Sequence, residues 1–247
     1  MSLILFDVDG TLLKAGRQVR QIFAAALREV YGETGDLDSY DFRGKTDPLI
    51  VRELLTGIGR DPEEVRRRLP EVRRQYLTRL ERDLDAGKMR ILPGVEETLE
   101  DLVRRDDLAI GLLTGNWQSG AWIKLGRLGL DRFFTVGAFG CDANDRADLP
   151  PRAWERAERE FGRPFDSDTT WIVGDSTEDV RCGRAHGIPV IGVTTGWTSG
   201  KELSRAGARE VIEGLSRLPA LLPGPGTTPA SGTGRSGGIP SPDRTIL

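Results

Sequence analysis

The sequence predicts an α/β protein built on a doubly wound parallel sheet, with a helical segment inserted after the first strand. Short apolar runs, typical of strands that are buried on both faces, alternate with amphipathic helices along most of the chain. Between residues 36 and 88 the sequence is helical and charged and contains no strand-like run. The alternation predicts the sheet, and the charged block predicts the inserted helices.

Each expected element follows from its own pattern of apolar and polar residues. The strands are short apolar runs, and they comprise residues 3–6, 108–113, 133–136, 169–173, 189–193 and 211–212. The helices repeat apolar residues at three- and four-residue steps, and they comprise 19–30, 65–80, 95–103, 118–128, 151–161 and a segment that ends near 186. Because Pro70 lies inside the helix at 65–80, we expect that helix to be kinked or split.

The end of the chain differs in composition from the rest. Residues 223–247 consist largely of Gly, Pro, Ser and Thr and offer almost nothing to bury, which is typical of a disordered tail. The remaining chain divides into a predicted α/β core, residues 1–14 and 89–222, and a predicted helical insert, residues 15–88.

Composition excludes several classes of function. The 247 residues carry 35 Lys and Arg against 38 Asp and Glu, a net charge of −3 that argues against a dedicated nucleic-acid or anionic-membrane binder. We find no membrane-length apolar run and no export signal, so we expect a cytoplasmic protein. A single histidine, His186, and two widely spaced cysteines argue against a histidine-based triad or a zinc site. Carboxylates, hydroxyls or a bound ion must therefore carry any chemistry.

Reactive polar residues follow three of the expected strands. Asp7 and Asp9 follow the first strand, Thr114 follows the strand at 108–113, and Asp175 follows a later one. Because ligands of open α/β sheets bind at the carboxyl ends of the strands, we expect these side chains to converge on one crevice. Clustered carboxylates are hard oxygen ligands, which favours Mg²⁺ over zinc. With a threonine hydroxyl and turn amides to hold a phosphate, the constellation predicts phosphoryl transfer to an aspartate.

Three ordered motifs resemble those of the haloacid dehalogenase superfamily. They are Asp7-Val8-Asp9-Gly10-Thr11, Leu112-Leu113-Thr114-Gly115-Asn116 and Gly174-Asp175-Ser176-Thr177-Glu178-Asp179-Val180. The segment from 192 to 208 is similar to the C-terminal pattern of the phosphoglycolate phosphatase-like branch, so the resemblance covers about residues 1–221. It implies a Rossmann-like doubly wound sheet, with the helical insert as an α-helical cap subdomain that selects the substrate.

The resemblance also implies a role for each matching residue. Asp7 would be the nucleophile that forms an aspartyl-phosphate. Asp9 would protonate the leaving oxygen and then deprotonate the hydrolytic water. Mg²⁺ would be held by Asp7, by the backbone carbonyl of Asp9 and by Asp175, with Asp179 supporting that site. The phosphoryl group would be bound by Thr114, Gly115 and Asn116.

The basic residue of the family's third motif has no unique match, because the usual Lys-Pro pair is absent. The candidates, in order of preference, are Arg146, Arg152 and Lys124. Within the helical insert, residues 42–47 resemble the specificity loop of the phosphoglycolate phosphatase-like members. Arg43 or Lys45 of this loop would contact an anionic part of the substrate.

The resemblance implies a Mg²⁺-dependent phosphatase that acts on a small phosphorylated metabolite, a phosphoglycolate-like phosphomonoester. A phosphomutase of the β-phosphoglucomutase type is an alternative, since it would use the same two aspartates. A carbon–halogen dehalogenase is disfavoured by Asp9 and by the metal ligands. A catalytically silent binding module would require a broken motif, and the motif residues are all present. We expect no nucleic-acid or membrane partner.

Overall fold

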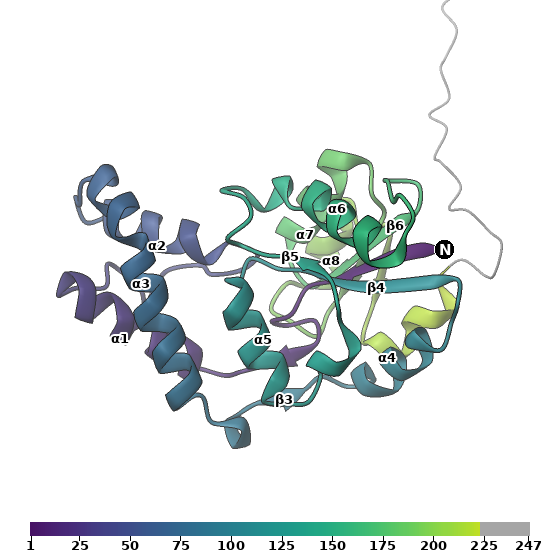
Figure 1. The fold of residues 1–247 in the computed structure, drawn as a ribbon, viewed down its shortest axis with the longest axis horizontal. Helices are drawn as coiled ribbons and strands as arrows, with labels where there is room; N and C mark the ends of the chain where they lie inside the picture. Colours follow the sequence, from purple (N-terminus) through teal and green to yellow (C-terminus); the bar gives the residue numbers. More distant parts are fainter. Residues whose placement is uncertain (223–247) are drawn as a thin grey trace, which may run out of the picture.

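The computed structural model describes residues 1–222, so the tail predicted to be disordered, residues 223–247, lies outside the described residues. A six-stranded parallel sheet with the order β5-β4-β1-β6-β7-β8 forms the centre (Figure 1). Its strands are β1 (Ser2–Phe6), β4 (Leu108–Leu113), β5 (Gly137–Ala138), β6 (Thr170–Gly174), β7 (Val190–Val193) and β8 (Glu210–Ile212). The predicted doubly wound parallel sheet is confirmed.

Strand β1 lies at the middle of the sheet and determines where a ligand can bind. Phe6 at its end is in register with Leu112 of β4 on one side and with Val173 of β6 on the other. The chain winds from β1 to β4 and β5 in one direction and continues through β6, β7 and β8 in the other. The carboxyl ends of β1, β4 and β6 therefore lie side by side at the point where the winding direction changes, which is the usual ligand site of this architecture.

Helices cover both faces of the sheet, as the complete burial of β1 requires. Ile4 and Phe6 face one core and Leu3 and Leu5 face the other, because successive side chains of a strand point to opposite faces. In the view of Figure 1, one set of helices lies above the sheet and another set lies below it. These are α6 (Pro150–Phe161), α7 (Thr177–His186) and α8 (Gly200–Ala206) above, and α4 (Val95–Val103) and α5 (Gln118–Gly126) below.

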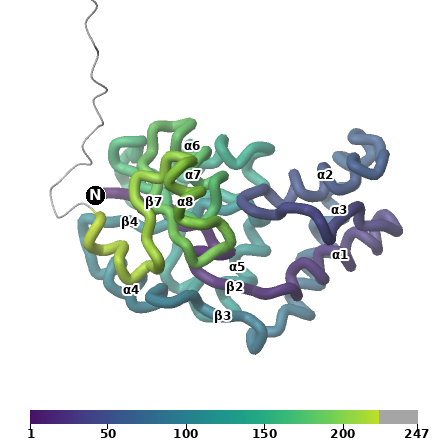
Figure 2. The backbone as a smooth tube through the Cα atoms, turned by 180° about the vertical axis from the view of Figure 1, so that it is seen from behind, coloured from purple at the N-terminus to yellow at the C-terminus, as the bar shows by residue number. Residues whose placement is uncertain are grey.

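The helical insert packs beside the carboxyl end of the sheet, opposite the N-terminus (Figure 1). It contains α1 (Gln18–Tyr31), α2 (Asp47–Thr56) and α3 (Pro62–Asp83). An antiparallel pair, β2 (Leu13–Lys14) and β3 (Arg90–Ile91), joins the insert to the sheet, as the reverse view shows (Figure 2). We did not predict this pair, because strands of two residues carry no periodic pattern. It lies beside the predicted division at residues 14 and 89, and those domain boundaries stay a prediction.

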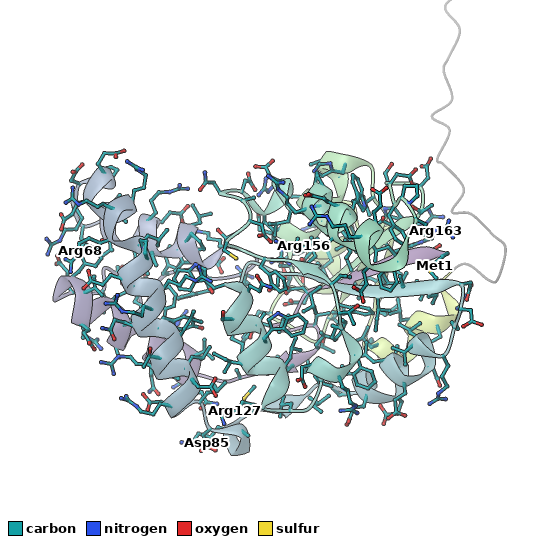
Figure 3. All side chains as sticks on the ribbon, in the orientation of Figure 1. Met1, Arg68, Asp85, Arg127, Arg156 and Arg163 are labelled. Carbon is teal, nitrogen blue, oxygen red and sulfur yellow. The ribbon has the colours of Figure 1, made fainter. Side chains whose placement is uncertain are left out.

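Helix α3 runs without interruption through Pro70, so the helix is not split there, whereas a kink at Pro70 stays a prediction. Pro70 is exposed, whereas Val65, Val72 and Tyr76 are buried against the rest of the insert. The missing proline N–H therefore leaves a helix carbonyl on the solvent side, where water can satisfy it. Arg66, Arg67, Arg74 and Arg82 of α3 are exposed. Arg68 of the same helix also lies at the surface, as Figure 3 shows.

Replacing Pro70 by Ala is expected to stabilise the protein. Alanine restores the lost backbone hydrogen bond in an exposed helix interior, where proline costs up to about 3 kcal/mol relative to alanine. Chemical denaturation should show a higher free energy of unfolding for Pro70→Ala. A variant less stable than the wild type would show that the proline geometry is needed where α3 packs on α1.

Two other elements differ from expectation. The strand expected at 133–136 lies further along the chain, at β5, where Gly137 and Ala138 pair with β4. The apolar residues Phe134 and Val136 are buried, but they precede the strand. Helix α8 was not predicted, although Ser199 and Glu202 form a capping box that marks its start.

Short 3₁₀ segments complete the described chain: Ala86–Lys88, Asp131–Phe133, Arg146–Asp148 and Leu215–Ala220. No described helix is long and apolar enough to span a membrane.

Candidate active site

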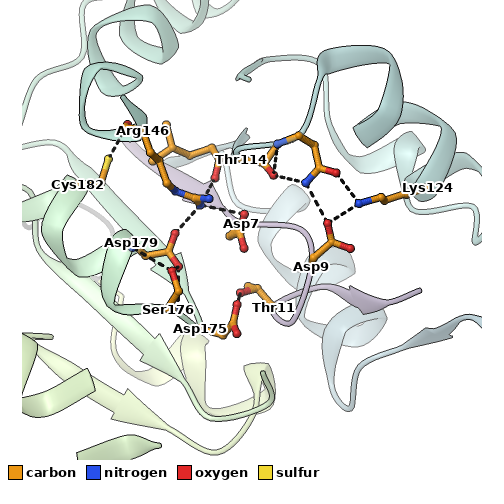
Figure 4. Close-up of polar contacts among 12 residues, drawn as sticks. Asp7, Asp9, Thr11, Thr114, Lys124, Arg146, Asp175, Ser176, Asp179 and Cys182 are labelled. Atoms are coloured by element: carbon orange, nitrogen blue, oxygen red, sulfur yellow. Dashed lines mark hydrogen bonds and ion pairs between the residues drawn. The ribbon is translucent and has the colours of Figure 1, made fainter. Parts of the chain in front are cut away.

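The structure brings the predicted site residues together at the carboxyl ends of three adjacent strands (Figure 4). Asp7 directly follows β1, Thr114 directly follows β4, and Asp175 directly follows β6. These three side chains, together with Asp9 and Arg146, line one cavity of about 1040 Å³. Residues of the sheet ends and of the helical insert both contribute to its walls, so a bound molecule would contact both parts of the protein.

Three buried carboxylates form a compact cluster on one side of this cavity. Asp7, Asp175 and Asp179 each place an oxygen within 4.8 Å of the other two. Burial raises the pKa of Asp7 to about 6 against the lowering effect of Arg146, and burial followed by the charges of Asp7 and Asp179 raises the pKa of Asp175 to about 8. A hard divalent cation would neutralise these carboxylates and bind their oxygens, so the donor set fits a metal such as Mg²⁺.

The side chain of Asp9 faces away from that cluster. Its Oδ2 accepts hydrogen bonds from Lys124 Nζ at 2.6 Å and from Asn116 Nδ2 at 2.9 Å. The third carboxylate of the cluster, beside those of Asp7 and Asp175, is that of Asp179 and not that of Asp9. The predicted contribution of Asp9 to the metal site, through its backbone carbonyl, stays a prediction.

Arg146 lies beside Asp7, where the third-motif cation is expected. Its Nη2 donates to Asp7 Oδ1 at 2.9 Å and to the carbonyl of Leu113 at 2.9 Å, and it also contacts Asp179 Oδ1. The side chain is buried. Of the other two candidates, Arg152 is exposed and pairs with Glu155, and Lys124 contacts Asp9. Of the three candidates, Arg146 is therefore the one that faces Asp7.

Asp179 both caps a helix and contacts the buried cation Arg146. It forms a capping box with Ser176 at the start of α7, where its Oδ2 accepts from the Ser176 N–H at 3.0 Å and from the Ser176 hydroxyl at 2.6 Å. Its Oδ1 contacts Arg146. The helix cap thus fixes a carboxylate that also holds the cation of the site.

The turn after β4 is held together by side-chain hydrogen bonds. Thr114 is buried, and its Oγ1 accepts from the Asn116 backbone N–H at 3.3 Å and from Asn116 Nδ2 at 2.8 Å. Between them, Gly115 approaches the helical insert so closely that a Cβ there would lie 2.1 Å from the carbonyl oxygen of Lys45. The predicted phosphate-binding turn therefore lies directly against the predicted specificity loop.

Asp47 at the start of α2 completes this contact between the insert and the turn. Its backbone N–H donates to the Gly115 carbonyl at 2.8 Å, and its Oδ2 accepts from the Trp117 N–H at 2.7 Å. Asp47 has no predicted role, because Thr46, Asp47 and a following proline are the ordinary start of a helix. The signal that could have found it is its position within the loop at 42–47.

The two basic residues of that loop are paired within the insert. Arg43 is exposed, lines the cavity and donates a fork of hydrogen bonds to Asp41. The hydrogen bond to Asp41 raises the pKa of Arg43, and the charge of Asp175 adds to the shift. Lys45 Nζ donates to Glu53 at 2.6 Å. Arg43 is thus held at the mouth of the cavity, within electrostatic reach of the carboxylate cluster.

A model of the haloacid dehalogenase-like hydrolase family matches residues 4–193. The chain belongs to this family. The match spans the ends of β1, β4 and β6 as well as the helical insert, so it covers the site described above. The resemblance inferred from the three motifs is confirmed.

Curated relatives of this haloacid dehalogenase-like hydrolase include phosphoglycolate phosphatases. One from Pseudomonas syringae pv. tomato is 27% identical over 221 residues, which cover 87% of this chain and 78% of the relative. Another, from Synechococcus elongatus, is 30% identical over 220 residues, which cover 88% of this chain and 95% of the relative. Among solved structures, a hydrolase from Pseudomonas syringae has a TM-score of 0.65 and 25% identity over 90% of this chain and 98% of its own.

Substituting Gly115 by Ala is expected to destabilise this haloacid dehalogenase-like hydrolase by about 1–3 kcal/mol, because the added Cβ would force the insert loop away from the turn. Chemical denaturation measures the loss. Gly126→Ala on α5 is the matched control, since its Cβ would meet nothing closer than 3.8 Å. If Gly115→Ala were as stable as Gly126→Ala, the insert would not be docked on the turn as described.

Proposed function

We propose that this protein is a Mg²⁺-dependent phosphatase that hydrolyses a small phosphorylated metabolite, a phosphoglycolate-like phosphomonoester, through an aspartyl-phosphate intermediate. The observation that carries the proposal is the environment of Asp7. This buried carboxylate at the end of the central strand is bonded to Arg146 and clustered with Asp175 and Asp179. A nucleophile beside one cation and a potential metal site can accept a phosphoryl group.

In the first step Asp7 attacks phosphorus, and the bond between phosphorus and the ester oxygen breaks. Asp9 gives its proton to the departing oxygen. Arg146 holds Oδ1 of Asp7, which fixes the orientation of the carboxylate and places a positive charge beside the incoming phosphate. The hydroxyl of Thr114 and the turn amides that follow it bind the phosphoryl oxygens. Mg²⁺ bound by the carboxylate cluster would supply charge neutralisation for the nucleophile and the phosphate.

In the second step Asp9, now ionised, removes a proton from water, and the water oxygen attacks phosphorus. The bond to Asp7 breaks, which releases inorganic phosphate and restores the free carboxylate. Asp9 is suited to both transfers because its side chain is one-third exposed and lines the cavity, whereas Asp7 is almost fully buried. The different exposure of the two aspartates thus supports a division between nucleophile and acid–base.

The relatives support the substrate class. Several curated relatives named phosphoglycolate phosphatase match most of the chain at 25–30% identity. A solved structure described as a putative β-phosphoglucomutase from Thermotoga maritima has a TM-score of 0.56 at 20% identity, which shows a shared fold alone. We therefore keep the phosphomutase as an outcome of the experiment.

A panel of phosphomonoesters, assayed for phosphate release with Mg²⁺ and with EDTA, tests the proposal. The panel should contain 2-phosphoglycolate, several sugar phosphates and 4-nitrophenyl phosphate. We expect release with Mg²⁺ from at least one small ester, and its loss with EDTA. If no ester released phosphate, the proposal would be wrong. Isomerisation of a sugar phosphate primed by a bisphosphate, faster than phosphate release, would assign the protein as a mutase.

A further inference from the structure

Lys124 is a buried ammonium group beside Asp9. It lies near the end of α5 with 3% of its side chain exposed, and its Nζ donates to Asp9 Oδ2 at 2.6 Å and to Asn116 Oδ1. Taking an ammonium group out of water costs several kcal/mol unless its partners are well placed. An apolar side chain would fill this place on the helix without that cost, so the charge itself calls for an explanation.

We propose that Lys124, assisted by Asn116, is the positioning residue for the acid–base carboxylate of Asp9; this assignment rests on the proposed phosphatase function. Both side chains donate to the same oxygen of Asp9, Oδ2, at 2.6 and 2.9 Å (Figure 4). Two donors on one oxygen fix the rotation of the carboxylate. They leave Oδ1 as the atom that gives and takes the proton at the substrate.

Asn116, one of the two donors to Asp9, is fixed by further hydrogen bonds. Asn116 Nδ2 also donates to Thr114 Oγ1 at 2.8 Å, and Asn116 Oδ1 accepts from Lys124. Lys124, Asn116 and Thr114 therefore form one connected network from α5 to the turn after β4. Such a network positions a side chain more accurately than a single hydrogen bond, because each member restricts the others.

The two buried cations of the site serve different aspartates. Arg146 contacts the nucleophile Asp7, and Lys124 contacts Asp9. A cation that only bound phosphate would change the rate on all substrates by the same factor. A residue that positions Asp9 changes the rate of proton transfer to the leaving group. The consequence depends on the leaving group, since an alkoxide needs a proton as it departs and an acidic phenolate does not.

A purely structural role is the competing explanation. The charge of Lys124 also lowers the pKa of Asp47, whose burial raises that pKa to about 6. Lys124 could thus serve the docking of the helical insert without any part in proton transfer. A structural role would lower activity on every substrate in proportion, and it would appear as a loss of stability.

The test compares Lys124→Met with the wild type on two esters, an alkyl phosphate found active in the panel and 4-nitrophenyl phosphate. We expect kcat/KM on the alkyl ester, which reports the steps up to departure of the leaving group, to fall by about 10²–10³-fold. We expect kcat/KM on 4-nitrophenyl phosphate, whose leaving group needs no proton, to fall by less than about tenfold. Lys201→Met on α8, an exposed lysine, is the matched control and should leave both activities unchanged.

A double-mutant cycle with Asp9→Asn separates the explanations. If Lys124 acts through Asp9, adding Lys124→Met to Asp9→Asn causes no further loss. Equal losses of kcat/KM for Lys124→Met on the two esters, or an additive loss in the double variant, would overturn the proposal. If Lys124→Met does not fold, Lys124→Gln is compared in the same way. A wild type inactive on every ester would instead refute the proposed phosphatase function.

Discussion

Replacing Asp7 by Asn is expected to abolish turnover, with a loss on the order of 10⁴-fold or more, because it removes the atom that bonds to phosphorus. The amide has nearly the same size and shape, so the cavity is retained. Steady-state phosphate release from the best ester of the panel measures the effect. Asp101→Asn, an exposed aspartate on α4, is the matched control and should retain full activity.

The Asp7→Asn variant should remain folded. Arg146 keeps its contacts with Asp179 and with the Leu113 carbonyl, so removal of the Asp7 charge does not leave this buried cation without a partner. Burial raises the pKa of Asp7 to about 6, which means that the ionised carboxylate is unfavourable in this position. A melting temperature at neutral pH that is no lower than that of the wild type checks the fold. Substantial turnover by a folded Asp7→Asn protein would rule out the aspartyl-phosphate mechanism.

The fold could be predicted from the sequence because its main elements carry strong local patterns. The central strands are continuous apolar runs, and they end at polar residues that cannot remain in a buried sheet. In a doubly wound sheet such strand ends are neighbours in space, so Asp7, Thr114 and Asp175 could be placed in one crevice before any geometry was known. Arg146 is preferred for a different reason, a family pattern tied to the helix that follows the third strand, and this pattern leaves Arg152 and Lys124 open as alternatives.

The remaining features of the site depend on packing between distant segments. Lys124 has the sequence signature of an ordinary helix cation, and its burial follows from the approach of α3 to α5. Asp47 has the signature of a helix start, and its contact with Trp117 joins residues 70 positions apart. The split expected at Pro70 is absent because α3 places Pro70 on its exposed side, where the proline is tolerated. Which side of α3 is exposed is known only once α1 and α3 are packed together. Local patterns hold no information on these contacts.

A divalent cation is expected to stabilise the protein more in alkaline than in acidic solution. In the absence of metal, burial raises the pKa of Asp7 to about 6 and that of Asp175 to about 8, from 3.8 in both cases. The folded protein therefore binds protons more tightly than the unfolded chain. The stability contributed by these groups is complete below about pH 4 and is lost as the pH rises through 6 and then 8. Mg²⁺ binds the ionised carboxylates, so it restores stability where protons have left the site.

Melting temperatures measured with Mg²⁺ and with EDTA test this coupling. At about pH 9 we expect Mg²⁺ at about 100 times its dissociation constant to raise the melting temperature by about 5–10 °C. At about pH 5 the rise should be much smaller, because protons compete for the same oxygens. An equal rise at both pH values would show that the cation binds elsewhere, away from the Asp7, Asp175 and Asp179 cluster.

Replacing Asp175 by Asn connects this stability effect to catalysis. The variant loses a carboxylate ligand, so we expect its melting temperature to lose the response to Mg²⁺ and its turnover to fall by about 10³-fold or more. In EDTA at alkaline pH it should be more stable than the wild type, because a neutral amide replaces a buried charge that is repelled by Asp7 and Asp179. Asp101→Asn should keep the full response to Mg²⁺. Loss of turnover with a retained melting-temperature response to Mg²⁺ would show that Asp175 is not a metal ligand. Loss of both, together with the higher stability in EDTA, would identify Asp175 as a metal ligand and as the source of the instability at alkaline pH.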